Sequence, residues 1–184
     1  APLLENIIVD SQNPNYASFD SIMYSKDMKT FIACGAGKTG TLSLPDTVTK
    51  IERSAADGCS KLSKIIIPNS VAQIGEWAFS DCSSVINIKI PDNDKYTEIG
   101  TGTFSGCGGT EIVIPKNIKI INRGNFGNNK TSKITFEDNT SLWKLELESG
   151  GTAVSGVPTD AFDVSSPSEN AKKFILKCLK PENE

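Results

Sequence analysis

A repeat of about 23 residues runs through the middle of the chain and limits what it can fold into. Prolines recur at intervals of 23, 23 and 24 residues, and cysteines at intervals of 23 and 25: Pro45, Pro68, Pro91 and Pro115, with Cys59, Cys82 and Cys107. A single unit of this length cannot bury enough apolar surface to offset the entropy lost when its backbone is ordered. Neighbouring units must therefore stack, and the sequence predicts a solenoid.

Each repeat, which we call a coil, begins with a short strand. Isoleucines alternate with other residues before each proline, which is the pattern of a strand with one buried face. Coil 1 spans 42–64, coil 2 spans 65–87, coil 3 begins at 88 and coil 4 at 112. The strands are expected in one parallel sheet, at 42–44, 65–67, 88–90, 112–114 and 134–136.

The rest of each coil is expected to hold a second extended stretch and a short helical turn. The stretch ends at Gly75 and Gly100, where a positive φ or a close backbone approach is expected. A column of aromatic residues follows, formed by Phe79, Phe104 and Phe126, with the smaller Ala56 in coil 1. Coil 1 is expected to be under-filled unless an upstream aromatic residue, Phe31 or Tyr24, inserts there.

Composition excludes several classes of function. The chain has no histidine, so catalysis and zinc binding that depend on an imidazole are absent. The formal net charge is −3, which argues against a nucleic-acid partner. No apolar run approaches the ~18 residues of a membrane span, so membrane insertion is not expected. We predict no catalytic, metal or cofactor site, and expect the three repeat cysteines to be buried, reduced and free of metal.

The repeat resembles that of the BspA-type leucine-rich repeat proteins. Residues 65–85, IIIPNSVAQIGEWAFSDCSSV, are similar to the family unit at nearly every fixed position, and residues 9–16 and 20–45 are similar to the family's N-terminal segment. The resemblance implies a mostly β, α/β repeat: a right-handed leucine-rich repeat solenoid with short parallel strands, one-turn helical segments and an N-terminal hairpin cap. It implies one domain over 1–184, with the cap at 1–41, coils at 42–141 and a degenerate C-terminal coil or cap at 142–184.

The same resemblance implies a role outside the cell. BspA-like proteins are typically secreted or surface-anchored proteins of host-associated bacteria, and they are thought to act in adhesion. We therefore expect a non-enzymatic recognition module that binds a host extracellular-matrix or cell-surface protein and is itself monomeric. The alternative is a structural spacer within a longer surface protein. The first residues, Ala-Pro-Leu-Leu-Glu, lack the features of a secretion signal, so any signal peptide is expected to have been removed.

A candidate partner-binding face follows from the strand pattern. Burying one set of alternating side chains places the other set on the outer surface of the sheet. Two of these residues are apolar and three are lysines, which would form a positive stripe; the alternative reading is that the lysines only keep the face soluble. The candidate residues are Lys64, Ile66, Asn87, Lys89, Glu111, Val113, Lys133 and Thr135.

Overall fold

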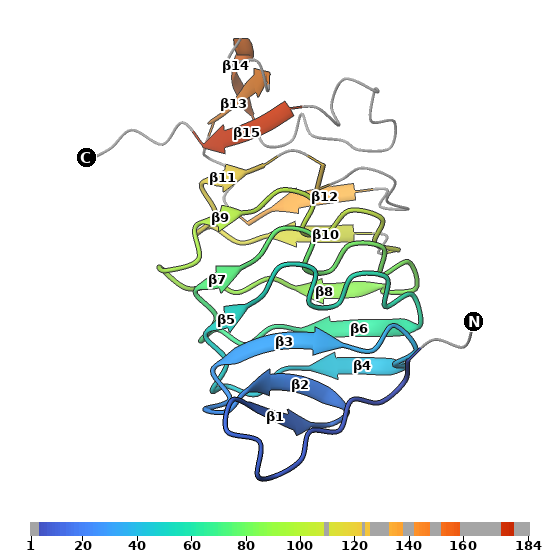
Figure 1. The fold of residues 1–184 in the computed structure, drawn as a ribbon. Helices are drawn as coiled ribbons and strands as arrows, with labels where there is room; N and C mark the ends of the chain where they lie inside the picture. Colours follow the sequence, from blue (N-terminus) through green and yellow to red (C-terminus); the bar gives the residue numbers. More distant parts are fainter. Residues whose placement is uncertain are drawn as a thin grey trace.

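The chain forms a mostly β solenoid of about four turns (Figure 1). The computed structural model describes residues 4–108, 111–122, 124–125, 133–137, 142–147, 152–158 and 174–178. Two columns of short strands run along the solenoid. One column holds β5 (Lys50–Ile51), β7 (Gln73–Ile74), β9 (Glu98–Ile99) and β11 (Ile120–Ile121). The other holds β4 (Gly40–Ser43), β6 (Leu62–Ile66), β8 (Asn87–Lys89), β10 (Glu111–Ile114) and β12 (Lys133–Phe136).

The strands at the start of the coils are parallel but do not form the single sheet that the sequence predicts. Strands β4, β6 and β8 form one hydrogen-bonded sheet, and β10 pairs with β12 in another. Strands β8 and β10 lie side by side without forming a ladder. The other column is interrupted in the same way between β7 and β9. Both interruptions flank residues 90–97, which connect β8 to β9.

A two-residue insertion and a large side chain in coil 3 account for the interruption. In the other coils the residue three positions after the proline donates its N–H to the proline carbonyl, and that residue is Val48, Val71 or Ile118. In coil 3 the corresponding bond runs from the Tyr96 N–H to Asn93. The Tyr96 ring thus occupies a column otherwise filled by smaller residues, and it is 2% exposed. A ring of this size in a close-packed column holds β7 and β9 apart.

Asparagine side chains fix the inserted loop. The Asn117 Nδ2 group lies within hydrogen-bond distance of three carbonyl oxygens of coil 3, at 3.1 Å from Pro91, 3.1 Å from Asn93 and 2.6 Å from Tyr96. The Asn93 Nδ2 group donates to the Val71 carbonyl of coil 2 at 2.9 Å. The insertion is therefore tied to the coils on both sides of it.

The N-terminal strands join the solenoid sheet directly. Strands β1 (Tyr16–Phe19), β2 (Ile22–Ser25) and β3 (Thr30–Cys34) are antiparallel, and β3 then pairs in parallel with β5. The predicted hairpin cap is corrected in this respect, because the hairpin is continuous with the ladder. Phe31 lies opposite Ile51, so it extends the isoleucine column and not the column of Ala56.

The described strands of the C-terminal region are antiparallel. Strands β13 (Leu142–Leu147) and β14 (Thr152–Pro158) pair with each other, β15 (Phe174–Cys178) pairs with β13, and β15 also pairs with β11. This arrangement differs from the parallel stacking of the coils before it. The division of the chain at 41 and 141 stays a prediction.

The third side of the solenoid is a stack of turns, and the predicted one-turn helices are absent from the described residues. Alternate N–H groups bond to the next coil: those of Ser54, Ala56 and Gly58 donate to Glu76, Ala78 and Ser80, and those of Trp77, Phe79 and Asp81 donate to Thr101, Thr103 and Ser105. The intervening groups bond within their own turn. A helix would direct every N–H along its own axis and leave no such ladder between coils.

Residues with a left-handed backbone conformation lie at both ends of these turns. One column holds Ser54, Trp77, Gly102 and Gly124, with φ of 55°, 59°, 62° and 76°, and a second holds Gly58, Asp81 and Gly106. Neither Gly75 nor Gly100 has a positive φ, so the first of the two expected alternatives does not apply. Gly75 is required for close approach instead, because a Cβ there would overlap the backbone of Arg53.

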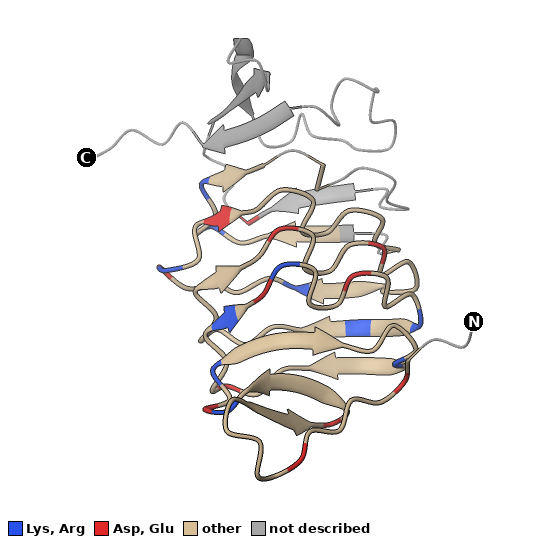
Figure 2. Ribbon diagram, viewed as in Figure 1, with Lys and Arg blue, Asp and Glu red and all other residues tan. Residues whose placement is uncertain are grey.

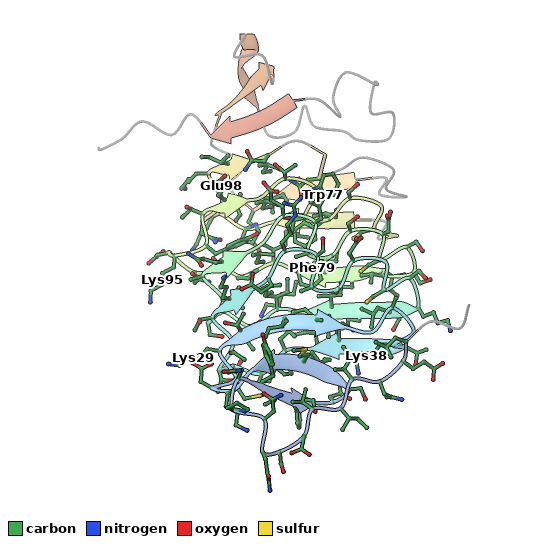
Figure 3. The ribbon with its side chains drawn as sticks, viewed as in Figure 1. Lys29, Lys38, Trp77, Phe79, Lys95 and Glu98 are labelled. Atoms are coloured by element: carbon green, nitrogen blue, oxygen red, sulfur yellow. The ribbon has the colours of Figure 1, made fainter. Side chains whose placement is uncertain are left out.

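The core is one continuous cluster between the three sides. The isoleucine, leucine and phenylalanine columns are buried throughout the described coils, and Phe79 stacks on Phe104 with ring centroids 6.0 Å apart (Figure 3). Phe31 and Tyr24 are both fully buried in this cluster. Phe126 lies outside the described residues.

The repeat cysteines form a buried ladder, as predicted. Cys59, Cys82 and Cys107 are each 0% exposed and carry free thiols. The Cys82 Sγ donates to the Ala56 carbonyl at 3.3 Å, and the Cys107 Sγ donates to the Phe79 carbonyl at 3.2 Å. Each thiol therefore bonds to the backbone of the preceding coil.

We predict that Cys82 and Cys107 resist labelling in the native protein. Burial raises the pKa of the Cys107 thiol to about 12 and also raises the pKa of Cys82, so neither forms the reactive thiolate at neutral pH. Titration with a chromophoric disulfide reagent at pH 7 and pH 9 should label Cys34 first, and should reach Cys82 and Cys107 only after denaturant is added. Rapid labelling of Cys82 in the folded protein would contradict the ladder.

Candidate interaction surface

The outer face of β4, β6, β8 and β10 carries the residues predicted to bind a partner. The register aligns Thr41 with Lys64 and Asn87 in one row, and Ser43 with Ile66 and Lys89 in the next. Lys64, Asn87 and Lys89 are exposed and Ile66 is half-buried. Val113 is 39% exposed on β10, which lies beside β8. The structure therefore brings these five candidates onto one face.

The remaining three candidates are placed only by their backbone. Glu111 pairs with Lys133 and Val113 pairs with Thr135 in the β10–β12 ladder. Their strands thus continue the same column of the solenoid. The side chains of Glu111, Lys133 and Thr135 lie outside the described residues.

Two lysines of this face make no ion pair with any acid whose side chain the structure describes. Ion pairs in the described part of the chain join Lys38 to Asp20, Lys50 to Glu52 and Arg53 to Glu76, and none involves Lys64 or Lys89. Figure 2 shows both as blue segments, on β6 and β8. Lys64 lies opposite Asn87, while Lys89 lies opposite Ile66, so each cation neighbours an uncharged residue.

Ile86 is an exposed apolar residue beside this surface that the repeat pattern did not predict. It is 67% exposed, directly before β8, and its N–H donates to the Ser63 carbonyl of the preceding coil at 3.1 Å. Strand alternation would bury Ile86, but the adjacent Val85 takes the buried position instead. Aligning the coils could have identified it, because the equivalent position of coil 1 holds the polar residue Ser63 and is therefore not a core position.

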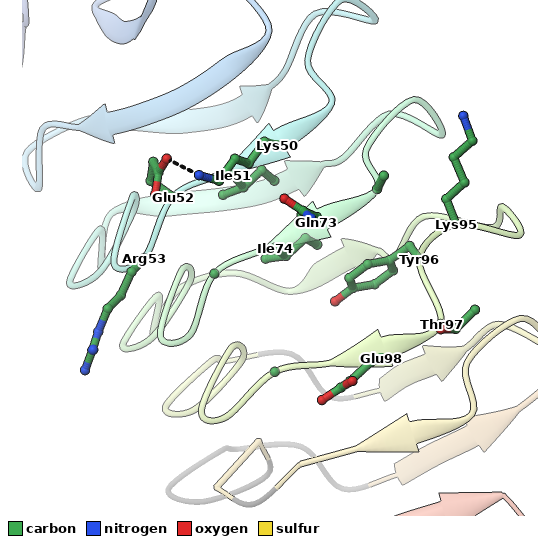
Figure 4. A pocket seen from close by; sticks show the side chains of 13 residues that line it. Lys50, Ile51, Glu52, Arg53, Gln73, Ile74, Lys95, Tyr96, Thr97 and Glu98 are labelled. Carbon is green, nitrogen blue, oxygen red and sulfur yellow. Dashed lines mark hydrogen bonds and ion pairs between the residues drawn. The ribbon is translucent and has the colours of Figure 1, made fainter.

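A pocket lies on the other column of strands, at the interruption between β7 and β9 (Figure 4). It has a volume of about 490 Å³, and its lining includes Gln73, Lys95 and Tyr96. Its charged groups are largely paired: the Lys50 Nζ lies 2.6 Å from the Glu52 Oε1, and the Asn122 Nδ2 donates to the Glu98 Oε1 at 2.6 Å. Lys95 is the exception, because its ammonium group makes no ion pair with the described residues.

The described residues offer no assembled group for chemistry at either surface. They contain no group of three or more Cys, Asp or Glu side chains placed to hold a metal ion. None of the helices that a bilayer span would require is present in this part of the chain.

Parallel ladders joined by a stack of turns, with inward columns of isoleucine and leucine, define a repeat protein of the leucine-rich type. The chain belongs to the family described as the BspA type leucine rich repeat region, whose model matches six copies of the repeat between residues 27 and 147.

Solved structures share this fold. A leucine rich cell surface protein from Faecalibacterium prausnitzii is 23% identical with a TM-score of 0.64, covering 74% of this chain and 43% of that one. The pneumococcal vaccine antigen PcpA is 22% identical with a TM-score of 0.67, covering 74% and 34%. A leucine-rich repeat protein from Bacteroides ovatus is 28% identical with a TM-score of 0.51, covering 73% and 33%. This chain thus spans less than half of each. No curated protein matches the sequence.

Proposed function

We propose that this chain is a non-enzymatic recognition module that binds a protein partner through the outer face of β4, β6, β8 and β10. The observation that carries the proposal is the pair of unneutralised lysines, Lys64 and Lys89, set among exposed apolar side chains. Exposed apolar area rimmed by charge is typical of contact surfaces. Ile66, Ile86 and Val113 supply that area.

The family and the fold support a surface role. The matching structures include a protein described as a cell surface protein and another described as a vaccine antigen. We propose that the chain acts at the cell surface or outside the cell as a monomer. The partner we propose is a host extracellular-matrix or cell-surface protein with an acidic patch, because the lysines favour negative charge.

A structural spacer is the second candidate. The outward residues of β4, Thr41 and Ser43, are small and polar, as expected of a solenoid that only projects another part of the protein. In that case Lys64 and Lys89 serve solubility alone. The two functions differ in whether a partner is retained and whether these residues set its affinity.

The test is a pull-down of host extracellular-matrix proteins with the purified chain, followed by titration of any protein it retains. The variants are Lys64→Glu with Lys89→Glu, and Ile66→Asp with Val113→Asp. We expect each pair to weaken binding at least tenfold, about 1.4 kcal/mol. The matched control is Lys29→Glu with Lys95→Glu, which makes the same charge change at exposed positions outside this face and should leave binding unchanged (Figure 3).

Two results would overturn the proposal. If the chain retains no matrix or cell-surface protein, the spacer function is favoured. If both face variants bind as the wild type does while the control variant loses binding, the docking surface lies on the opposite column. Thermal unfolding of each variant, measured first, ensures that a loss of binding reflects the surface, because Ile66 is half-buried.

A further inference from the structure

Two cysteines meet where the N-terminal hairpin joins the first turn of the stack. The Cys34 Sγ and the Cys59 Sγ each lie 3.6 Å from the same acceptor, the Gly35 carbonyl oxygen. The Cys59 Sγ also lies 4.0 Å from the Cys34 carbonyl oxygen. Both sulfurs thus approach the same oxygen atom from neighbouring segments, so this pair is unlike an isolated thiol.

The backbone holds the two residues together. The Cys34 N–H donates to the Ala55 carbonyl at 2.7 Å, and the Cys59 N–H donates to the Ala56 carbonyl at 3.2 Å. Cys34 is therefore anchored to the same turn that ends at Cys59. Cys82 and Cys107 differ, because each donates to a carbonyl, of Ala56 and Phe79, that no second thiol approaches among the described hydrogen bonds.

The two thiols also differ in chemistry. A hydrogen bond from the Cys59 thiol would stabilise the Cys34 thiolate, and this bond, with the nearby Lys38 ammonium, lowers the pKa of Cys34 despite its partial burial. The same bond and burial raise the pKa of Cys59. Cys34 is also partly exposed, whereas Cys59 is fully buried. Cys34 is thus suited to attack an external disulfide. Once Cys34 is held in a mixed disulfide it has no thiolate, so two of the causes that raise the pKa of Cys59 are removed and Cys59 can resolve the product.

We propose that Cys34 and Cys59 form a disulfide when the protein meets a small-molecule disulfide such as oxidised glutathione. The Cys34 thiolate attacks one sulfur of the oxidant, forming a mixed disulfide and releasing one glutathione thiolate. The Cys59 sulfur then attacks Cys34, breaks the mixed disulfide and releases the second glutathione thiolate. The two protons of the protein thiols pass to the two glutathione thiolates, so two protein thiols are oxidised and one oxidant molecule is reduced.

The bond would staple β3 to the first turn. It would close a loop between residues 25 positions apart in the sequence. Cross-links over loops of this size restrict the unfolded chain, and we expect oxidation to raise the midpoint of thermal unfolding by roughly 6–12 °C. Such a staple suits a protein that works outside the cell, where disulfides persist.

The test is incubation of the full chain with oxidised glutathione at pH 8, followed by tryptic mapping without reduction. Lys38, Lys50 and Arg53 lie between the two cysteines, so trypsin separates them unless a disulfide joins their peptides. We expect the joined peptide, a protein lighter by two hydrogen atoms, and the rise in unfolding temperature. Cys82→Ala serves as the matched control and should give the same joined peptide.

Cys34→Ala and Cys59→Ala should each abolish the joined peptide and the temperature shift. Should Cys59→Ala fail to fold, the map of the wild type and of Cys34→Ala decides. The proposal is overturned if Cys34 accumulates as a glutathione adduct, if it pairs with another cysteine, or if the native protein is not oxidised at all.

Discussion

Replacing Gly102 by alanine should destabilise the solenoid by about 2–5 kcal/mol, with two separable causes. Gly102 has a φ of 62°, which costs a residue with a Cβ about 1–2 kcal/mol. A Cβ there would also overlap the indole ring of Trp77, which lies across this position from the preceding coil. Overpacking of this kind adds about 1–3 kcal/mol. Urea unfolding monitored by circular dichroism gives the loss.

The matched control is Gly58→Ala. Gly58 has a φ of 72°, but no atom lies within 4 Å of the position its Cβ would take. This variant should lose only the backbone cost. Trp77→Ala combined with Gly102→Ala should remove the overlap, so the two changes should be less than additive. Equal losses for Gly58→Ala and Gly102→Ala would show that Trp77 does not press on this position.

Truncating Phe79 to alanine should cost about 3–5 kcal/mol of stability. The side chain is fully buried and stacked on Phe104 at an interplanar angle of 6°, so its removal leaves a cavity between coils 2 and 3. The loss should appear in the urea midpoint with an unchanged slope.

Two further variants serve as controls for Phe79→Ala. Phe79→Leu keeps most of the volume and should cost clearly less than Phe79→Ala. Ile86→Ala removes a side chain that is 67% exposed and should change stability by no more than about 0.5 kcal/mol. A loss below about 1 kcal/mol for Phe79→Ala would mean that the phenylalanine column does not couple the coils.

Features that recur with the repeat could be predicted from the sequence. The buried isoleucine columns and the buried cysteine column follow from spacing alone, because a residue at the same place in each coil meets the same environment. For the same reason Lys64, Asn87 and Lys89 could be assigned to the outer face of their strands. The repeat thus determines the local structure of each coil.

Features that depend on one departure from the repeat could not be predicted. The break between β7 and β9 results from the bulk of Tyr96 and the loop before it, and neither has an equivalent in the other coils. The prediction of a helical turn was wrong because a short segment after a strand can direct its N–H groups either along its own axis or to the next coil, and the repeat pattern is the same in both cases. Ile86 was missed because it breaks the alternation of its own strand.

The interruption beside Tyr96 divides the solenoid into two mechanical units. Strands β7 and β8 close the first unit, while β9 and β10 open the second. The turn stack remains continuous across the boundary, through the N–H groups of Trp77, Phe79 and Asp81 and the carbonyls of coil 3. On the ladder sides the inserted loop bridges the boundary through side-chain bonds such as that of Asn93 to the Val71 carbonyl, so under a bending load we expect these sides to part before the turn side. We therefore expect the solenoid to bend most easily at its middle, about the turn side, because the coils with uninterrupted ladders resist bending.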